Sequence, residues 1–212
     1  MIPIISVLLP SVRPGNLPWS MGTVSAAASG IPYEIVVVAD FGPEQYPYTK
    51  WIVDERKGPI DAIQLAYAAS EGEYLFVFND ESRLEPGALA SLYYAALTDP
   101  RRVLTPYHVP PFGFEYYGLP FAAFPFVRRD VIQELGGLFD PAYKAFYADP
   151  DFSMRAHAKR IPVETIQSAV IRHTNHHASE DDIKPHNWAK YIDNDRALFR
   201  TRWDHLGAFR DP

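Results

Sequence analysis

YLFVF at residues 74–78, followed at once by NDE at residues 79–81, is the stretch that decides the fold. Apolar runs of this length that end in turn-forming residues are typical of strands buried on both faces in a parallel sheet. Three oxygen-bearing side chains directly after such a strand are costly unless they bind a ligand or cap the next helix. The stretch therefore predicts a buried strand with either a hard-cation site or a capping turn at its carboxyl end.

Two other apolar runs have the same character. Ile4–Leu9 ends at Pro10, and Tyr33–Ala39 ends at Asp40. Before the stretch quoted above, Gly58–Ser70 has apolar residues among alanines, which predicts a helix. Strand, helix and strand in this order imply a right-handed crossover, so the polar ends of the three strands meet at one crevice. We therefore expect an α/β fold with a mostly parallel central sheet flanked by helices.

The remainder of the sequence predicts further helices and strands of ordinary length. Helices are expected at Ala88–Leu97, Arg129–Leu135 and Asp151–Ala158, the last with Asp151 as its N-cap, and strands at Phe126–Arg128 and Ile161–Ile171. Residues 106–125, rich in aromatic residues, Pro and Gly, predict a packed irregular connection, with or without a strand in it, or, alternatively, the wall of an acceptor pocket. Apolar spacing from Trp188 to Trp203 predicts an amphipathic helix that packs on the domain, with a membrane-surface or partner role as the alternative.

Composition limits the classes of protein that fit. The chain has 212 residues, of which 47% are hydrophobic and 22% are charged, and this is ordinary for one globular domain. A formal net charge of −6 argues against a nucleic-acid binder, which usually has a basic excess. There are no cysteines, and no apolar run approaches the length of about 18–20 residues that spans a bilayer. The N-terminus lacks the pattern of a signal peptide, so we expect a cytoplasmic protein.

Five short segments carry a resemblance to a known family, and they occur in the order in which the family has them. They are ISVLLPS at residues 5–11, EIVVVAD at 34–40, NDE at 79–81, GGLFD at 136–140 and ADPDFSMR at 148–155. In these segments the sequence resembles the inverting glycosyltransferases of family 2, which have the GT-A fold. The resemblance implies one Rossmann-like domain over residues 1–212. Its expected parts are a nucleotide-sugar-binding half at 1–105, an acceptor and catalytic half at 106–180, and a C-terminal amphipathic helix at 186–206.

The resemblance implies a donor site at the ends of the first strands. Pro10 and Ser11 match the nucleotide-binding loop of the family, and Asp40 matches an Asp that contacts the nucleotide base. Gln64 lies where the family has the Asn of an Arg-Asn pair, on the helix that leads to the metal motif. Arg13 follows the first loop, where it either contacts phosphate or is solvated. The implied donor is a nucleotide-diphospho-sugar of the UDP or dTDP type.

The resemblance also implies a divalent cation, Mn²⁺ or Mg²⁺. NDE at residues 79–81 takes the place of the family's Asp-x-Asp metal motif and is similar to the Asn-x-Asp variant of rhamnosyltransferase-like members. By this match Glu81 is the metal-ligand candidate, Asp80 is a helper at the variable position, and Asn79 belongs to the donor site. His173 matches a late histidine that is a further metal or diphosphate ligand in some members.

A single carboxylate is the implied catalytic base. Asp149 matches the first Asp of the family's Glu-Asp-x-Asp-Leu-x-x-Arg motif, and its alternative role is that of a helix-capping carboxylate. A base at this place takes the proton of the acceptor hydroxyl, and one displacement inverts the anomeric carbon. The implied acceptor is a hydroxyl-bearing glycan or small molecule, and peripheral contact with a membrane is a further expectation.

Departures from the family pattern keep other functions open. They favour a nucleotide-sugar-binding module without turnover, and they are Ala39, Asn79, Ala148 and the pair Ile63-Gln64. A nucleotidyltransferase has a related architecture, but residues 10–14 are not the glycine-rich phosphate loop expected for it. His173, His176 and His177 with the acidic residues 180–182 leave open a separate transition-metal site or an iron-dependent oxygenase.

Overall fold

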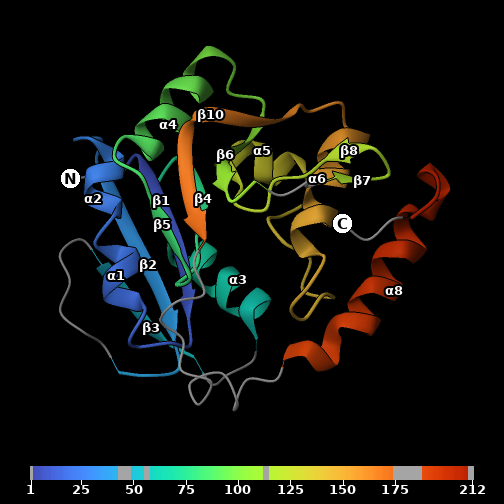
Figure 1. Ribbon diagram of the computed structural model, residues 1–212, viewed down its shortest axis with the longest axis horizontal. Helices are drawn as coiled ribbons and strands as arrows, with labels where there is room; N and C mark the ends of the chain where they lie inside the picture. The colour runs from blue at the N-terminus through green and yellow to red at the C-terminus, as the bar shows by residue number, and fades with distance from the viewer. Residues whose placement is uncertain (1, 43–48, 55–57, 112–114, 174–187, 210–212) are drawn as a thin grey trace.

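The computed structural model describes residues 2–42, 49–54, 58–111, 115–173 and 188–209 (Figure 1). The strands in these residues are β1 (Ile5–Ser11), β2 (Tyr33–Ala39), β3 (Thr49–Val53), β4 (Tyr74–Val77), β5 (Ser82–Leu84), β6 (Val103–Val109), β7 (Glu115–Tyr116), β8 (Leu119–Pro120), β9 (Phe126–Arg128) and β10 (Val163–His173). The helices are α1 (Leu17–Met21), α2 (Val24–Ala28), α3 (Pro59–Ala69), α4 (Ala88–Thr98), α5 (Arg129–Glu134), α6 (Ala148–Ala158) and α8 (Ile192–Trp203), with the 3₁₀ turns η2 (Trp188–Tyr191) and η3 (Asp204–Leu206).

Eight strands form one sheet in the order β3-β2-β1-β4-β9-β6-β10-β5, and β7 and β8 form a separate hairpin. β3, β2, β1 and β4 are parallel, as are β6 and β10, whereas β9 is antiparallel to both of its neighbours and β5 is antiparallel to β10. β1 lies inside the parallel half, where Leu8 pairs with Val36 on one side and Val77 on the other. The expected α/β fold with a mostly parallel, helix-flanked sheet is confirmed.

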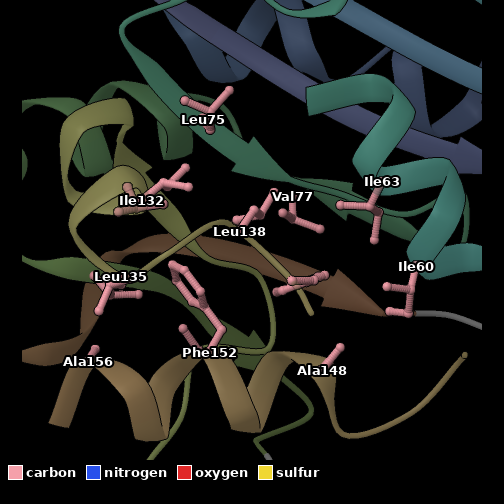
Figure 2. Packing of buried hydrophobic residues seen from close by; sticks show 14 of the residues in the cluster. Ile60, Ile63, Leu75, Val77, Ile132, Leu135, Leu138, Ala148, Phe152 and Ala156 are labelled. Carbon is pink, nitrogen blue, oxygen red and sulfur yellow. The ribbon is translucent and has the colours of Figure 1, made fainter. Parts of the chain in front are cut away.

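Helices cover both faces of the sheet, and each face has its own core because successive side chains of a strand point to opposite faces. Leu8 belongs to the core beneath α3, α5 and α6, whereas its neighbour Val7 belongs to the core beneath α1, α2 and α4. Figure 2 shows part of the first core, where Ile63 of α3, Val77 of β4 and Phe152 of α6 gather. The sheet is therefore buried on both sides, which explains the uninterrupted apolar runs of its strands.

The first strand is longer than the sequence predicts. Pro10 was expected to end it, but β1 continues to Ser11, and Pro10 pairs with Val38 of β2. β4 pairs with β1 only as far as Leu8, so Pro10 lies where β1 has a single neighbour and a missing N–H is tolerated. Ser11 is thereby placed at the carboxyl edge of the sheet, level with the end of β2.

The segment 106–125 contains regular strands. β6 runs into it as far as Val109 and is a central strand of the sheet, and the hairpin of β7 and β8 follows. The sequence left open whether the segment holds a strand, because Pro106 and His108 interrupt the apolar residues of β6.

The prediction that Asp151 is a helix N-cap is wrong. α6 begins at Ala148, and the amide of Asp151 donates to the carbonyl of Tyr147 at 3.0 Å, as in a helix interior. The carboxylate of Asp151 is fully buried and accepts hydrogen bonds from Tyr143 Oη, Arg155 Nε and Trp203 Nε1 at 3.0–3.1 Å. Asp151 therefore links α6 to the C-terminal helix.

The C-terminal segment forms η2 and α8, and α8 packs against the domain through the buried Phe199 and the partly buried Leu198 and Trp203 (Figure 1). The packing interpretation of this helix agrees with these contacts. Of the helices in the described ranges, none combines the length and the apolar character that a membrane crossing requires.

Gly72 lies against β1 so closely that a side chain has no room there. Its amide donates to Ser6 Oγ at 2.8 Å, and an added Cβ would be 2.6 Å from both the amide nitrogen and Oγ of Ser6. Gly72→Ala should therefore force β1 and the start of β4 apart and lower the free energy of unfolding by about 1–3 kcal/mol. Urea unfolding measures this, with Gly15→Ala as the control because nothing lies within 4 Å of that position. Equal losses in the two variants would contradict the close approach.

Candidate active site

The first of two adjoining cavities opens at the carboxyl ends of β1, β2, β3 and β4 and has a volume of about 160 Å³. Its walls come from the loops that follow these strands and from the start of α3. The lining residues are Pro10, Ser11, Val12, Arg13, Val38, Ala39, Asp40, Asp54, Gly58, Pro59, Ala62, Asn79, Asp80, Glu81 and Trp188. Such a crevice outside the carboxyl ends of parallel strands is where open α/β sheets bind ligands.

Asp80 joins the loop after β1 to the loop after β4. Its Oδ2 accepts hydrogen bonds from Ser11 Oγ at 2.7 Å and from the amide of Val12 at 3.3 Å, and its Oδ1 forms an ion pair with Arg13 Nη1 at 2.8 Å. Burial raises the pKa of Asp80, and Arg13 and Ser11 oppose that effect. Because only 3% of Asp80 is exposed and both carboxylate oxygens have protein partners, this residue holds the two loops together. The expectation that Asp80 helps to bind metal stays a prediction.

Glu81 lies between the guanidinium of Arg13 and the imidazole of His173. Its Oε1 forms an ion pair with Arg13 Nη2 at 2.6 Å, and its Oε2 is 3.2 Å from Nε2 of His173. β10 brings His173 to this place because it pairs with β5, in a register that sets His173 opposite Ser82. The hydrogen bond with His173 lowers the pKa of Glu81, and Arg13 lowers it further, so the carboxylate is ionised.

The second cavity is larger, about 760 Å³, and adjoins the first at Pro10, Pro59, Asn79 and Glu81, which line both. It lies between the sheet, α3 and the start of α6. Asp149 and His173 line it together with Asn79 and Glu81. The remaining lining residues are mostly apolar or aromatic: Ile60, Ile63, Val77, Phe78, His108, Tyr116, Phe121, Ala123, Phe124, Phe139, Ala145, Phe146, Tyr147, Pro150 and Ile192. Glu81 and Asp149 therefore share one cleft.

Asp149 lies in the first turn of α6, and its surroundings change its acidity. The residue is partly exposed toward the cavity, whereas its neighbours Ala148 and Pro150 are buried. Burial among the apolar walls raises the pKa of Asp149 to about 7, since an ionised carboxylate there loses hydration. A carboxyl group with this pKa accepts a proton efficiently at neutral pH.

Most of the residues expected at the site are brought together. Pro10, Ser11, Arg13, Asp40, Asn79, Asp80 and Glu81 line the first cavity, and Asp149 and His173 line the second. Gln64 is an exception, because its Nε2 donates to the carbonyl of Phe139 and the residue lines neither cavity. Gln64 thus connects α3 to the loop before α6. The histidines and acidic residues at 176–182 lie outside the described residues.

Two residues of the first cavity were missed by sequence reasoning. Asp54 follows β3, an edge strand with only half-buried side chains, and its amide donates to the carbonyl of Ala39 at 2.8 Å. The β-branched and aromatic residues Trp51, Ile52 and Val53 were the available signal for this strand. Trp188 comes from the C-terminal segment, and nothing in the sequence pattern indicates that it reaches the first strands.

The donor set at Glu81 fits a divalent cation in part. Among the residues that the structure describes, no three Asp, Glu or His side chains are grouped for metal binding. The 3.2 Å between Glu81 Oε2 and His173 Nε2 is nonetheless close to the separation of about 3 Å expected for adjacent ligands of an octahedral ion. In the described part of the chain Asn79 Oδ1 is buried and accepts no hydrogen bond. The carboxylate of Glu81 and the imidazole of His173 are thus close enough to face one ion, and Asn79 lines the same cavity.

Two solved structures have folds similar to this one. TarS of S. aureus, a glycosyltransferase of family 2, superposes with a TM-score of 0.61 at 16% identity over 94% of this chain and 43% of its own. GalNAc-T7, solved with UDP, GalNAc and Mn²⁺, superposes with a TM-score of 0.66 at 14% identity over 99% of this chain and 52% of its own.

The chain has the GT-A fold. It spans about half the length of these two solved structures. No protein-family model matches the sequence, and no curated protein matches it.

Asp149→Asn should stabilise the folded protein in a pH-dependent way. Because the folded pKa of about 7 lies above the ordinary value of 3.8, the folded state holds this proton to a higher pH than the unfolded state. Wild-type stability is therefore lost as pH rises between these two values, and the variant lacks that loss. Each pKa unit is worth about 1.4 kcal/mol, and solvent in the cavity reduces the total, so we expect the variant to be more stable by about 2 kcal/mol at pH 8.

Urea unfolding of both proteins from pH 5 to pH 8 measures this difference in free energy. It should grow as the pH rises from 5 to about 7 and level off above the pKa of Asp149. A difference that is the same at both ends of the range would contradict the raised pKa of Asp149.

Proposed function

We propose that the chain is a glycosyltransferase that binds a nucleotide-diphospho-sugar and passes its sugar to a hydroxyl acceptor with inversion. The observation that carries this function is the cleft that Glu81 and Asp149 share. A charged centre suited to a diphosphate adjoins a cavity that is also lined by Asp149, a carboxyl group with a pKa of about 7. The similarity in fold to TarS and GalNAc-T7 supports glycosyl transfer.

The first cavity is suited to the nucleotide. Arg13 supplies positive charge beside Glu81, where a diphosphate would cross from one cavity to the other. Asp40 and Asp54 lie on the opposite wall, at the ends of β2 and β3, where carboxylates can accept hydrogen bonds from ribose hydroxyls or a base N–H. A UDP or dTDP donor is favoured, in line with the UDP present in the GalNAc-T7 structure.

Glu81 and His173 would hold the cation, with the amide oxygen of Asn79 as a further ligand. Mn²⁺ or Mg²⁺ bound there would neutralise the charge that develops on the diphosphate as it leaves. Arg13 contributes a fixed positive charge to the same leaving group, because Asp80 and Ser11 orient the loop that carries it.

The second cavity is suited to the acceptor and to the sugar that is transferred. Its aromatic walls can stack against sugar rings, and Asp149 faces the space from the start of α6. In the displacement, the acceptor oxygen forms a bond to the anomeric carbon while the bond from that carbon to the diphosphate breaks. The electron pair leaves with the nucleoside diphosphate, and the acceptor proton goes to Asp149. A single displacement of this kind inverts the configuration.

Two alternatives make different demands on the site. A binding module without turnover has no need for a carboxyl group whose pKa is raised into the neutral range at the cavity wall, as it is at Asp149. A nucleotidyltransferase would be expected to wrap phosphates with a glycine-rich loop after β1. Here that loop is held instead by the contacts of Ser11, Val12 and Arg13 with Asp80.

Asp149→Asn tests the base directly. An amide cannot take the acceptor proton, so transfer from a UDP- or dTDP-sugar should fall by about 10²–10⁴-fold. Donor affinity should stay within about two-fold, since the nucleotide and the diphosphate of the donor bind in the first cavity, which Asp149 does not line. Product formation by mass spectrometry and donor binding by calorimetry provide the two measurements.

Asp99→Asn is the matched control, because that carboxylate is exposed at the end of α4. It should transfer at the wild-type rate. Wild-type protein that binds sugar nucleotides but neither hydrolyses nor transfers them would favour the binding module instead.

Glu81→Gln tests the cation site. The wild type should bind UDP more tightly with Mn²⁺ than without it, and the variant should lose about 10–100-fold of the Mn²⁺-dependent affinity, since a charged ligand of the ion becomes neutral. Calorimetric titration of UDP with Mn²⁺ or with chelator measures both affinities. Glu85→Gln is the control, because this carboxylate pairs with Arg172 away from both cavities. An unchanged response of Glu81→Gln to Mn²⁺ would place the cation elsewhere.

A further inference from the structure

Asp195 of α8 is a buried carboxylate whose partners are backbone amides. Only 2% of the residue is exposed. Its oxygens accept hydrogen bonds from the amides of Lys144 at 3.1 and 3.2 Å, Ala145 at 2.9 Å and Phe146 at 2.9 Å. Three consecutive amides thus converge on one side chain that is about 50 residues away in the sequence.

The same helix also holds the next residue, Tyr147. Arg196 Nε donates to Tyr147 Oη at 2.9 Å, and the ring of Phe199 lies 5.4 Å from that of Tyr147. Tyr147 has a φ of 61°, in the left-handed region that residues other than glycine rarely adopt. A non-glycine residue persists in that conformation only when its surroundings fix it, and here α8 supplies much of the surroundings.

The segment 144–147 leads directly into the site. Ala145, Phe146 and Tyr147 line the second cavity, and Tyr147 is the N-cap of α6, which carries Asp149 in its first turn. A displacement of this segment therefore changes both the wall of the cavity and the starting direction of α6. Residues 144–147 are described by the structure and belong to no strand or helix, so the contacts with α8 hold them in place of regular backbone hydrogen bonding.

We propose that Asp195 is a positioning residue, which fixes the segment Lys144–Phe146 and through it the place of Asp149 at the wall of the acceptor cavity. The catalytic consequence rests on the glycosyl transfer proposed above, whereas the structural consequence is independent of it. Asp195 touches neither cavity and acts only through the amides that it binds.

Asp195 is separable from the attachment of α8 to the domain. Near the other end of the helix, Arg202 pairs with Asp140 at 2.7 Å, and Trp203 Nε1 donates to Asp151 at 3.0 Å. These contacts remain when Asp195 is altered, so α8 stays attached. We therefore expect a change at Asp195 to disturb the segment 144–146 and to leave the rest of the fold in place.

Asp195→Asn is the test, with Asp193→Asn as the matched control. The amide side chain keeps one acceptor oxygen but turns an NH₂ group toward backbone donors, so at least one of the hydrogen bonds is lost. Asp193 lies on the same helix, and its side chain is 87% exposed and paired with Arg196. Hydrogen–deuterium exchange should show the amides of residues 144–146 exchanging about 10-fold faster or more in Asp195→Asn and unchanged in Asp193→Asn.

A second measurement separates positioning from general stability. Carboxyl-carbon NMR follows the ionisation of Asp149, whose pKa of about 7 in the wild type depends on its burial among apolar neighbours. In Asp195→Asn the pKa of Asp149 should move toward 3.8 as those neighbours are displaced, whereas a merely less stable protein would keep the wild-type pKa. Faster exchange at 144–146 with an unchanged Asp149 titration would overturn the positioning role, and so would unchanged exchange.

Kinetics give the third measurement. Asp195→Asn should lower kcat by about 10–100-fold and raise the KM for acceptor, with a smaller change in the KM for donor, because the nucleotide and the diphosphate bind in the first cavity, which is not displaced. A wild type without transferase activity would end the proposed function, whereas the exchange and NMR results would still decide the role of Asp195. If Asp195→Asn no longer unfolds cooperatively, Asp195→Glu replaces it, because this variant keeps a carboxylate and only lengthens the side chain. Faster exchange at 144–146 with a lowered pKa of Asp149 would then support the positioning role. Unchanged exchange or an unchanged pKa would overturn it.

Discussion

The ionic contact of Arg13 with Asp80 and Glu81 is the interaction on which the rest of the site depends. One guanidinium reaches two successive carboxylates that follow β4, and Ser11 adds a hydrogen bond to the first of them. Because Asp80 is buried, removal of its partners would leave an uncompensated charge, and such a loss is strongly destabilising. The two loops are therefore fixed together, and Glu81 is held at the boundary of the two cavities.

The change of strand direction within the sheet explains why a cleft exists beside this contact. β1 to β4 run parallel, but β9, the next strand, runs antiparallel and brings a different set of loops to the carboxyl edge. The chain therefore leaves β4 without a parallel neighbour on that side, and residues of β6, β10 and α6 complete the second cavity. One half of the site consists of consecutive strand ends, and the other consists of segments distant in the sequence.

That difference decides what could be predicted from the sequence. The strands β1, β2 and β4 and their polar ends, including Ser11, Asp40 and Glu81, follow from local apolar runs and turn residues, so they were predicted with nearly the observed limits. The edge strand β3 was missed. The walls of the second cavity depend on tertiary contacts that no local pattern encodes. Asp151 shows the limit well, because its sequence context is that of a helix cap, whereas its actual partners, Tyr143 and Trp203, come from outside the helix.

The pKa of Asp149 also depends on tertiary contacts and not on the local sequence alone. Its position in the chain could be matched to a motif, but its pKa depends on apolar surfaces contributed by the sheet, by α3 and by the segment before α6. A fully exposed carboxyl group in the same motif would have an ordinary pKa and would be a weaker base at neutral pH. If Asp195 has the positioning role proposed above, the pKa of Asp149 depends on the contacts of the C-terminal helix with the segment 144–147 as well as on its own local sequence.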